Sequence, residues 1–454
     1  MPETKPSSIP SHPVETPFRK IATPLPAPES ESVLADHELY EALPVGGQPP
    51  IVWDHAEGFH IYDVAGNKWI DFTSGVLVTN SGHGRKEVVE AIIEQAKKPL
   101  LHSFGFANKA RIALAKRLVE LTPAVLTKVF LLTTGSESTE CAIKLMRTHG
   151  RRIRTDKSVI VSFEHGFHGR TLGAQMIGGI PAAKEWIGHL DPGMVQVPFP
   201  DGFRNPHVYF DGFLKALDDA GVDPKNVAGV ICETYQGGSA AFAPPAYWQE
   251  MRRWCDEHEA LITFDEVQAS FGRTGKLFSF EHYDVIPDLL CVGKGVSGSL
   301  PLSGVIGKGE LMDQYPPLSM TQTHGGNPVC AAAALANINL IVDEDLVGNA
   351  ARVGEVLHRE LWEQLKPFDK HVGAIQGKGL CAGIHIIKDA SNTPDGQLAH
   401  DITWHAVGRG LMLFAPVGLG MASLKLCPPL CITEEAVIDG VRALADAFGD
   451  CLST

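Results

Sequence analysis

The sequence predicts an α/β fold in which helices cover both faces of a mostly parallel sheet. Short β-branched or leucine-rich runs alternate with helical segments through the middle of the chain, as in "KVFLLTTG", "VAGVICET" and "LITFDE". A parallel sheet is buried on both faces, so its strands carry continuous apolar runs of this kind. Strand patterns near both ends of the chain further predict a smaller α+β domain built from the two ends.

The first segment, residues 1–32, is rich in Pro, Ser, Thr and Glu and has few large apolar side chains. Such a segment buries too little surface to offset the entropy of ordering, which predicts a flexible N-terminal arm or an extended strap. Residues 33–90 form the N-terminal part of the small domain. They contain a hairpin around Ala65-Gly66-Asn67, and a helical pattern that begins near their end continues into the next segment and stops at Pro99.

Residues 91–335 contain the alternating strands and helices and are expected to form the large domain. Residues 336–454 begin with helical patterns such as "ARVGEVLHRELWEQL" and continue with the strand patterns "GLCAGIHII" and "SLKLCPPLCIT". A closing helix follows. This part completes the small domain together with the N-terminal hairpin.

Composition and charge favour a cytoplasmic enzyme. No apolar run approaches the ~20 residues that cross a bilayer, and the N-terminus has no apolar signal-peptide core. Nine cysteines without repeating spacing indicate reduced thiols, and the pair Cys427 and Cys431 has no second ligand pair nearby, so no metal is expected. The net charge of −14 argues against a nucleic-acid partner.

The segment "GKGVSG", residues 293–298, matches the glycine pattern of a dinucleotide-binding turn. That turn must open a helix and be followed by an acidic residue about 20 positions later. Here "SLPL" follows directly, and position 318 is leucine. The context therefore excludes nicotinamide-dinucleotide binding, and Lys294 becomes the residue of interest.

Lys294 follows a buried strand and lies between glycines, at the sheet edge where ligands bind in open α/β sheets. Desolvation there makes an amine nucleophilic toward carbonyls. Asp265 follows the apolar run Leu261–Phe264, so its carboxylate is expected to be partly buried and to need a partner. A protonated pyridine nitrogen is one such partner, and a helix cap or loop hydrogen bond is the alternative.

A phosphate site is predicted at "TTGSES", residues 133–138, where a strand ends and Gly135-Ser136 open a helix. Free N–H groups and the helix dipole bind anions there, although simple N-capping by a serine gives the same pattern. In "EHGFHGRT", Phe167 and His168 lie between glycines, where an aromatic ring is able to stack on a flat ligand.

These motifs occur in the order that is typical of one family. Residues 48 to about 440 resemble the class III aminotransferases, which are pyridoxal-phosphate enzymes of fold type I. The resemblance rests on "TTGSESTECAIKLMR", "GFHGRT", "FDEVQASFGRTG", "DLLCVGKGVSGSLPLSGVIG", "THGGNPVCAAAALA" and "LKLCPPLCIT". It implies a large domain with a seven-stranded sheet, and pyridoxal 5'-phosphate as cofactor.

The resemblance also implies the roles of individual residues. Lys294 would bind the cofactor as a Schiff base and move the substrate proton, and Asp265 would pair with the ring nitrogen. Thr323 would complete the phosphate cup from a neighbouring subunit, which implies a homodimer or a dimer of dimers. The cofactor-binding residues expected in all are Gly135, Ser136, Phe167, His168, Glu233, Asp265, Val267, Gln268, Lys294 and Thr323.

The substrate side departs from the family pattern. The family motif has a glutamate at the position of Glu233 and a second one at the position of Gly238. The second glutamate gates an arginine in many members, and this chain has Lys425 at the position of that arginine. A lysine recognises a carboxylate as a point charge and not as a bidentate fork, so we expect weaker or differently placed recognition of an α-carboxylate. Arg170 matches an arginine that binds a substrate carboxylate in related enzymes, or it has a structural role. Val76 replaces a glutamine of dialkylglycine decarboxylases, which disfavours decarboxylation.

The resulting prediction is a transaminase that moves an amino group from an amine or amino acid to a 2-keto acid, such as pyruvate or 2-oxoglutarate, in two half-reactions. Two alternatives remain open. One is an amino-acid or lactam racemase of the same family, which would also need Lys294 and Asp265. The other is a cofactor-binding protein without activity.

Overall fold

The computed structural model describes residues 8–452, and the chain divides into two compact units. Unit 2 consists of residues 86–237 and 241–347, and unit 1 of residues 1–85, 238–240 and 348–454. The sequence places the corresponding limits at 90/91 and 335/336. The fold class is confirmed, because one unit holds a mostly parallel seven-stranded sheet and the other joins both ends of the chain.

The sheet of unit 2 is parallel except at one strand, β12, which runs antiparallel to both of its neighbours. Four adjacent pairings, from β11 across to β8, are parallel. In spatial order the strands are β6 (Lys128–Leu132), β12 (Ser303–Gly307), β11 (Leu289–Val292), β10 (Leu261–Asp265), β9 (Val227–Glu233), β7 (Val159–Phe163) and β8 (Met194–Val197).

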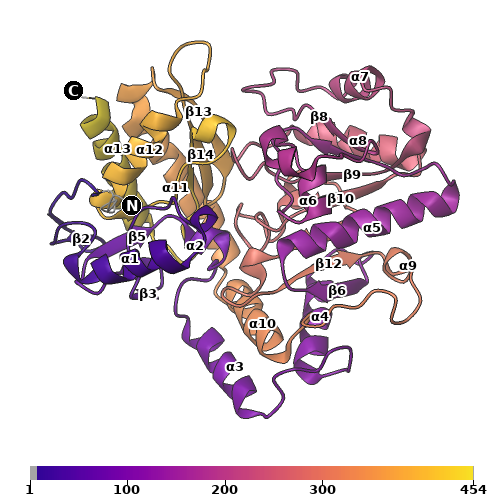
Figure 1. Ribbon diagram of the computed structural model, residues 1–454, viewed down its shortest axis with the longest axis horizontal. Coiled ribbons are helices and arrows are strands. Elements are labelled where there is room, and N and C mark those ends of the chain that lie inside the picture. Colours follow the sequence, from indigo (N-terminus) through magenta and orange to yellow (C-terminus); the bar gives the residue numbers. More distant parts are fainter. Residues whose placement is uncertain (1–7, 453–454) are drawn as a thin grey trace. The chain divides into compact units, whose positions relative to one another are not determined.

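Helices cover the two faces of this sheet. Along β10, Leu261 belongs to a core shared with α5 (Gly135–Ile153) and α6 (Leu172–Ile177), and Thr263 Oγ1 contacts Met146 of α5. Phe264, the residue after Thr263, packs against Trp248 of α8 (Pro245–Glu257), with ring centroids 5.2 Å apart. Because side chains alternate along a strand, α5 and α8 lie on opposite faces of the sheet (Figure 1).

The register of the central strands brings their carboxyl ends to one edge. Asp265 at the end of β10 pairs with Glu233 on β9 and with Cys291 on β11. The remaining helices of unit 2 lie outside the sheet: α3 (Lys86–Lys97), α4 (Lys109–Leu121), α7 (Asp211–Asp219), α9 (Gly309–Met312) and α10 (Pro328–Asp343). The edge formed by Glu233, Asp265 and the end of β11 positions the site described below.

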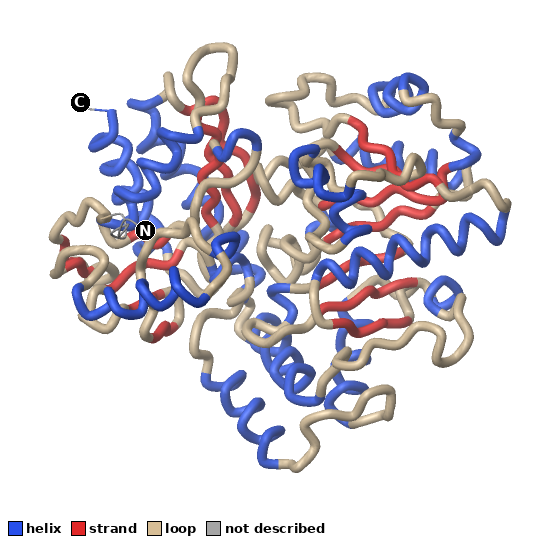
Figure 2. Tube along the Cα trace, in the orientation of Figure 1, coloured by secondary structure: helices blue, strands red, loops and turns tan. Residues whose placement is uncertain are grey.

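Unit 1 has two sheets, visible as separate groups of strands in Figure 2. The first sheet joins the two chain ends, because β15 from the C-terminal part pairs with β5 of the N-terminal hairpin. This pairing agrees with the prediction that the hairpin and the C-terminal part form one domain. Its strands are β1 (Val14–Glu15), β2 (Lys20–Ile21), β5 (Lys68–Asp71), β4 (His60–Tyr62), β3 (His55–Glu57) and β15 (Leu411–Met412). The second contains β13 (Val372–Lys378), β14 (Cys381–Ile386) and β16 (Ser423–Leu426).

The helices of unit 1 come from both ends of the chain. α1 (Glu31–Tyr40) and the short α2 (Ser74–Leu77) belong to the N-terminal part, whereas α12 (Gly396–Gly408) and α13 (Glu434–Leu452) belong to the C-terminal part. α11 (Leu346–Leu365) begins at the boundary between the units. No helix in residues 8–452 combines the length and the hydropathy that a membrane span requires.

Residues 8–30, here called the N-terminal strap, are bound to the rest of unit 1. Arg19 is only 6% exposed and forms a two-pronged ion pair with Asp439 on α13, with both N–O distances at 2.7 Å. His12 N donates to Gly408 O at the end of α12. Residues 1–7 of the predicted arm lie outside the described residues. Of the two predicted alternatives, a flexible arm or an extended strap, the described part is therefore a strap, because a buried ion pair and backbone hydrogen bonds hold it.

Candidate active site

The start of α5 presents free N–H groups. Thr134 caps the helix and forms a reciprocal capping box with Glu137, whose carboxylate accepts from the Thr133 and Thr134 N–H groups. The first intrahelical hydrogen bond runs from Ser138 N to Thr134 O, so the Gly135 and Ser136 N–H groups precede the helical ladder. Such N–H groups bind an anion such as a phosphate.

Glycines shape the surroundings of this helix end. A Cβ on Gly169 would lie 2.3 Å from Ser136 Oγ, and Gly169 has a φ of +132°, which L side chains rarely adopt. A Cβ on Gly135 would lie 2.8 Å from Val267, and one on Gly293 would lie 3.1 Å from it. The Val267 side chain therefore packs directly against backbone on two sides.

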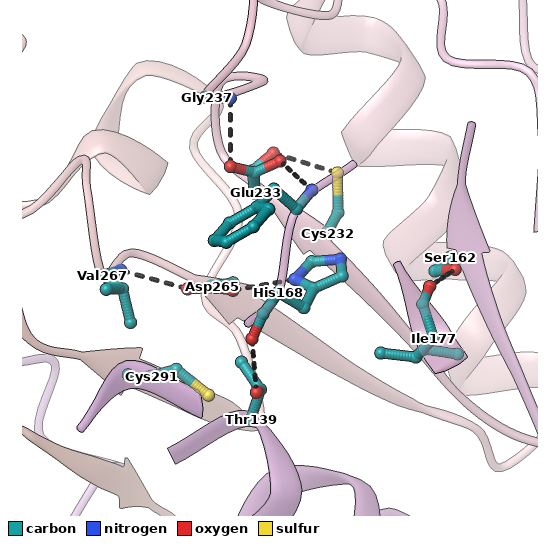
Figure 3. Close-up of polar contacts among 12 residues, drawn as sticks. Thr139, Ser162, His168, Ile177, Cys232, Glu233, Gly237, Asp265, Val267 and Cys291 are labelled. Atoms are coloured by element: carbon teal, nitrogen blue, oxygen red, sulfur yellow. Dashed lines mark hydrogen bonds and ion pairs between the residues drawn. The ribbon is translucent and has the colours of Figure 1, made fainter. Parts of the chain in front are cut away.

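The buried carboxylate of Asp265 is held from two directions. His168 Nδ1 lies 2.7 Å from Asp265 Oδ2, and Val267 N donates to Oδ1 at 3.1 Å (Figure 3). Asp265 is 5% exposed, and the side chain of His168 is 1% exposed. His168 is held in turn by Thr139, whose Oγ1 donates to the His168 carbonyl at 2.7 Å.

The charges around His168 decide its protonation. Burial acts to lower the pKa of His168, but its hydrogen bond to Asp265 and the negative charges of Asp265 and Glu233 outweigh that effect and raise the pKa. When its imidazole is protonated, His168 therefore forms an ion pair with Asp265. The pair fixes the orientation of the carboxylate at the strand end.

Glu233 holds the loops on either side of the site together. Its Oε2 accepts from Phe167 N at 2.9 Å and its Oε1 from Gly237 N at 3.0 Å (Figure 3). A Cβ on Gly237 would lie 2.4 Å from Gln268 Nε2, so the Gln268 amide lies against this loop. Glu233 thus orients the Phe167 segment from the neighbouring strand.

Lys294 follows β11, the strand next to β10, and begins a short 3-10 helix, Lys294–Val296. Its φ is +42°, an unusual conformation for a residue with a side chain. Backbone strain of this kind costs about 1–3 kcal/mol and is concentrated at functional sites, where the surrounding structure enforces it. The short turn also agrees with the prediction that no dinucleotide-binding helix follows these glycines.

The surrounding structure includes one residue that the sequence reasoning missed. Asn337 on α10 is fully buried, and its Nδ2 donates to the carbonyls of Gly295 (2.8 Å) and Val296 (3.1 Å). It therefore holds the turn that carries Lys294. A polar residue inside the apolar helix sequence "AAAALANINLIV" was the available signal.

Two further predicted residues lie near the start of α5. Arg170 N donates to Ser136 Oγ at 3.2 Å, and the exposed Arg170 guanidinium lies 5.6 Å from the centre of the Phe167 ring. Thr323 is exposed, and the preceding Gln322 donates to Thr133 and Glu137 of the same chain. Gln322 thus ties the segment before Thr323 to the start of α5 in its own chain.

Val76 and Lys425 belong to unit 1. Val76 is 48% exposed and lies in a left-handed turn, Ser74–Leu77, that Ser74 ties to β16 by donating to the Cys427 carbonyl at 2.6 Å. Lys425 on β16 is 4% exposed and pairs with Gly383 on β14. The segment that contains Gly238 packs on the same sheet, because a Cβ on Gly383 would lie 2.1 Å from Ser239 O.

Gly238 itself contacts another glycine. A Cβ on Gly238 would lie 3.1 Å from Gly418 Cα, and a Cβ on Gly418 would lie 2.4 Å from Gly238 O. The position of the family's gating glutamate is therefore closed by backbone. A side chain there requires the 417–423 loop to move.

The residues of unit 2 fit pyridoxal phosphate. The start of α5 offers N–H groups for a phosphate. The glycines at 135, 169 and 293 stand at close-packed positions, where an added Cβ would collide with Val267 or Ser136. A buried carboxylate lies at the end of β10, and a lysine in a strained turn follows the adjacent strand. An α/β protein with this arrangement is a pyridoxal-phosphate enzyme of the transaminase class.

The chain belongs to the class-III aminotransferases, whose family pattern matches residues 43–448. The family resemblance drawn from the motifs is therefore confirmed. So are pyridoxal phosphate as the cofactor and transamination, with amine and keto-acid substrates, as the activity.

Relatives with two kinds of activity are about equally similar. The chain is 33% identical to a leucine/methionine racemase of Thermococcus litoralis over 88% of this chain and 91% of that protein. It is 34% identical to an acetylornithine aminotransferase of Methanopyrus kandleri, over 88% and 94%. Its structure resembles an (S)-enantioselective omega-transaminase from Thermomicrobium roseum, with a TM-score of 0.85, 27% identity, and coverage of 93% and 98%.

Proposed function

We propose that Lys294 and Asp265 carry out the transamination chemistry of this protein, with amines or amino acids, ω-amino acids included, as donors. The observation that carries the assignment is the register of two adjacent strands. Asp265 pairs with Cys291, and Lys294 follows three residues later at the same sheet edge. An acid and an amine at neighbouring carboxyl ends of parallel strands supply the two groups that a pyridoxal-phosphate site needs.

Each residue has a defined task in this proposal. Bound pyridoxal phosphate supplies an aldehyde that takes up nitrogen and a ring that withdraws electrons from the substrate Cα. The Lys294 amine would take the proton from the substrate Cα and deliver it to the cofactor carbon that carries the nitrogen. Asp265 would accept a hydrogen bond from the ring nitrogen, and its contact with His168 keeps the carboxylate oriented. The N–H groups of Gly135 and Ser136 bind the phosphate.

The ring contacts follow from the same framework. Phe167 would stack on the ring, Val267 would pack beneath it, and the Gln268 amide would lie near the phenolic oxygen. Thr323 of a second copy completes the phosphate site, which makes the protein a homodimer or a dimer of dimers. Exposed apolar side chains in unit 2 support this assembly, including Phe106 (79%) and Leu318 (83%). The nine cysteines, all within the described residues, form no disulfide, which supports a cytoplasmic location.

The test is a half-reaction assay. Protein loaded with pyridoxal phosphate is mixed with an amine donor, and the change in the cofactor's visible absorbance is followed. Lys294→Ala is expected to lose turnover, and borohydride reduction is expected to label Lys294 in the parent protein. Lys215→Ala, which changes an exposed lysine on α7, is the control and should keep both. Normal turnover of Lys294→Ala would refute the assignment.

The substrate side is assigned to Lys425, Arg170 and Val76. Lys425 meets an α-carboxylate as a single charge, and Gly238 stands where the family has its gating glutamate. Arg170 is the second candidate for a carboxylate, and Val76 provides an apolar wall. A screen of α-amino acids, ω-amino acids, diamines and simple amines against pyruvate and 2-oxoglutarate tests this. Use of glutamate alone would contradict it.

Racemisation of amino acids is a second candidate activity. The similarity to a racemase equals that to an aminotransferase, and the 233–240 segment departs from the usual aminotransferase pattern. Incubating one enantiomer of leucine or alanine without a keto acid separates the two activities. Loss of optical rotation at constant amino-acid concentration supports racemisation, whereas one keto acid formed per cofactor supports transamination alone.

A further inference from the structure

Three side chains from distant parts of unit 1 converge near the end of the chain. His12 lies on the N-terminal strap, His405 in the last turn of α12, and Asp450 in the last turn of α13. A nitrogen of each imidazole and an oxygen of the carboxylate lie within 4.8 Å of one another. The proposed transamination uses none of these residues.

The spacing of these atoms matches a tetrahedral metal site. His12 Nε2 and His405 Nδ1 each lie 3.3 Å from Asp450 Oδ2. Zinc binds nitrogen and carboxylate oxygen at about 2.0–2.2 Å, which places neighbouring ligand atoms of a tetrahedron about 3.3–3.5 Å apart. Two of the three ligand pairs therefore already have the required separation.

The state of His12 also favours a bound cation. Its Nε2 is closed off from solvent and has no hydrogen-bond partner. An imidazole nitrogen is a common metal ligand, and a buried polar nitrogen without a hydrogen-bond partner is otherwise costly.

The charges nearby leave room for a divalent ion. Arg409 donates to both carboxylate oxygens of Asp450, at 2.7 and 2.8 Å, and lies 3.7 Å from Asp446. With one arginine and two aspartates, the group has a net charge of −1 when both histidines are neutral. The Arg409 hydrogen bonds orient the carboxylate, as partners of metal-binding carboxylates commonly do.

A way in for the ion is present. An open hollow of ≈ 590 Å³ reaches the Asp450 side of the group and is lined in part by Arg409, Asp446 and Asp450, but not by the two histidines. His12 is 32% exposed in its side chain, so its ring has space to turn toward an ion. Metal sites need such an entry path as well as the ligands.

We propose that His12, His405 and Asp450 bind a zinc ion that fastens the N-terminal strap to α12 and α13. Two imidazoles and one carboxylate suit zinc, whereas magnesium and calcium prefer oxygen ligands alone. Three protein ligands leave the fourth position to water. The site is structural, because its ligands join three separate segments of unit 1.

The test uses the tag-free, full-length protein loaded with pyridoxal phosphate. After chelator treatment and dialysis, zinc is added in a calorimetric titration, and cobalt(II) is added separately to record its visible absorption. We expect one zinc per chain, an intense tetrahedral cobalt spectrum and a higher unfolding temperature with zinc. His12→Ala and His405→Ala are each expected to weaken zinc binding at least tenfold and to remove the rise in unfolding temperature.

His37→Ala is the matched control. His37 is a half-buried histidine of unit 1 whose Nδ1 lies 2.8 Å from one carboxylate, Glu41. This variant should bind zinc as the parent does. Unfolding temperatures without zinc establish that each variant is folded, and the two ligand variants change different segments. The proposal is overturned if the parent binds no zinc, or if either ligand variant keeps the parental affinity.

Discussion

The imidazole of His168 lies 2.7 Å from the carboxylate of Asp265, and both side chains are buried at the carboxyl edge of the sheet. This contact joins the loop after β7 to the end of β10, 97 residues further along the chain. It gives the carboxylate a fixed direction and a positive partner.

The first prediction concerns this pair. His168→Gln removes the positive partner, so the carboxylate of Asp265 loses a charge-assisted hydrogen bond worth about 1.5–3 kcal/mol. We expect kcat/KM to fall on the order of 10- to 100-fold. The pH profile of kcat/KM should also change, because the raised pKa of His168 no longer contributes. Steady-state assays between pH 5 and 9 measure both effects.

His207→Ala serves as the control, since this exposed histidine also lies beside an aspartate, Asp211, but outside the site. It should leave the pH profile unchanged. A His168→Gln enzyme with the parental rate and profile would show that the pair has no part in the reaction.

The second prediction concerns the phosphate end. Gly169→Ala places a Cβ against Ser136 Oγ at a φ of +132°, so the start of α5 must shift. We expect the affinity for pyridoxal phosphate to fall about tenfold or more, since strain of about 1–3 kcal/mol is transmitted to the N–H groups. Titration of the apoprotein with the cofactor, followed by absorbance, measures this. Gly105→Ala, where nothing lies near the new Cβ, should bind normally.

The third prediction concerns Glu266, which points away from the site and accepts from Ser279 N and Phe280 N. Burial raises the pKa of Glu266 to about 8 from an ordinary value of 4.5. The folded state therefore holds a proton that the unfolded state releases, and stability falls as pH rises from about 4.5 to about 8.

Glu266→Gln keeps the size of the side chain but cannot ionise, and its amide nitrogen no longer accepts from one of the two N–H groups, which lowers stability by an amount that does not depend on pH. Its stability relative to the parent should therefore increase as pH rises from 5 to 8. Urea denaturation at several pH values measures the difference. A difference that stays constant over this range would mean that Glu266 is charged in the folded protein.

The fourth prediction concerns the turn that carries Lys294. Asn337→Ala leaves the carbonyls of Gly295 and Val296 without their buried donor, which costs about 2 kcal/mol or more in the free energy of unfolding. Turnover should fall as well, because the Lys294 turn is released. Asn339→Ala, on the same helix but half-buried, should cost less. Equal losses in the two variants would contradict the role given to Asn337.

The fifth prediction concerns the altered gating position. Gly238→Glu restores the family residue, but its Cβ meets Gly418 Cα at 3.1 Å, so the 417–423 loop must move. We expect a lower unfolding temperature and no gain in glutamate-dependent activity. A stable variant with increased activity toward glutamate would show that the loop accommodates the side chain.

Much of the proposed site could be predicted from the sequence because its residues lie in local motifs. A strand that ends at a glycine and serine before a helix has free N–H groups whatever surrounds it, so Gly135 and Ser136 were predictable. Asp265 and Lys294 each follow an apolar run, and strand ends meet at one edge in a parallel sheet. Family resemblance then gave these positions their chemistry.

Contacts between segments far apart in the chain needed the tertiary structure. His168 was expected among the cofactor contacts, but only the fold places its imidazole on Asp265. Asn337, the close approach of Gly238 to Gly418, and the meeting of His12 with His405 and Asp450 carry no local signal that names their partners.

The sequence by itself determined the fold class, the cofactor and the residues at the strand ends, because each depends on patterns that span a few residues. The tertiary structure decided which groups hold those residues in place and how the N-terminal strap is bound. The physical reason is that hydrogen bonds and ion pairs between distant segments depend on distances of a few tenths of an ångström, and those are set only when the whole chain has packed.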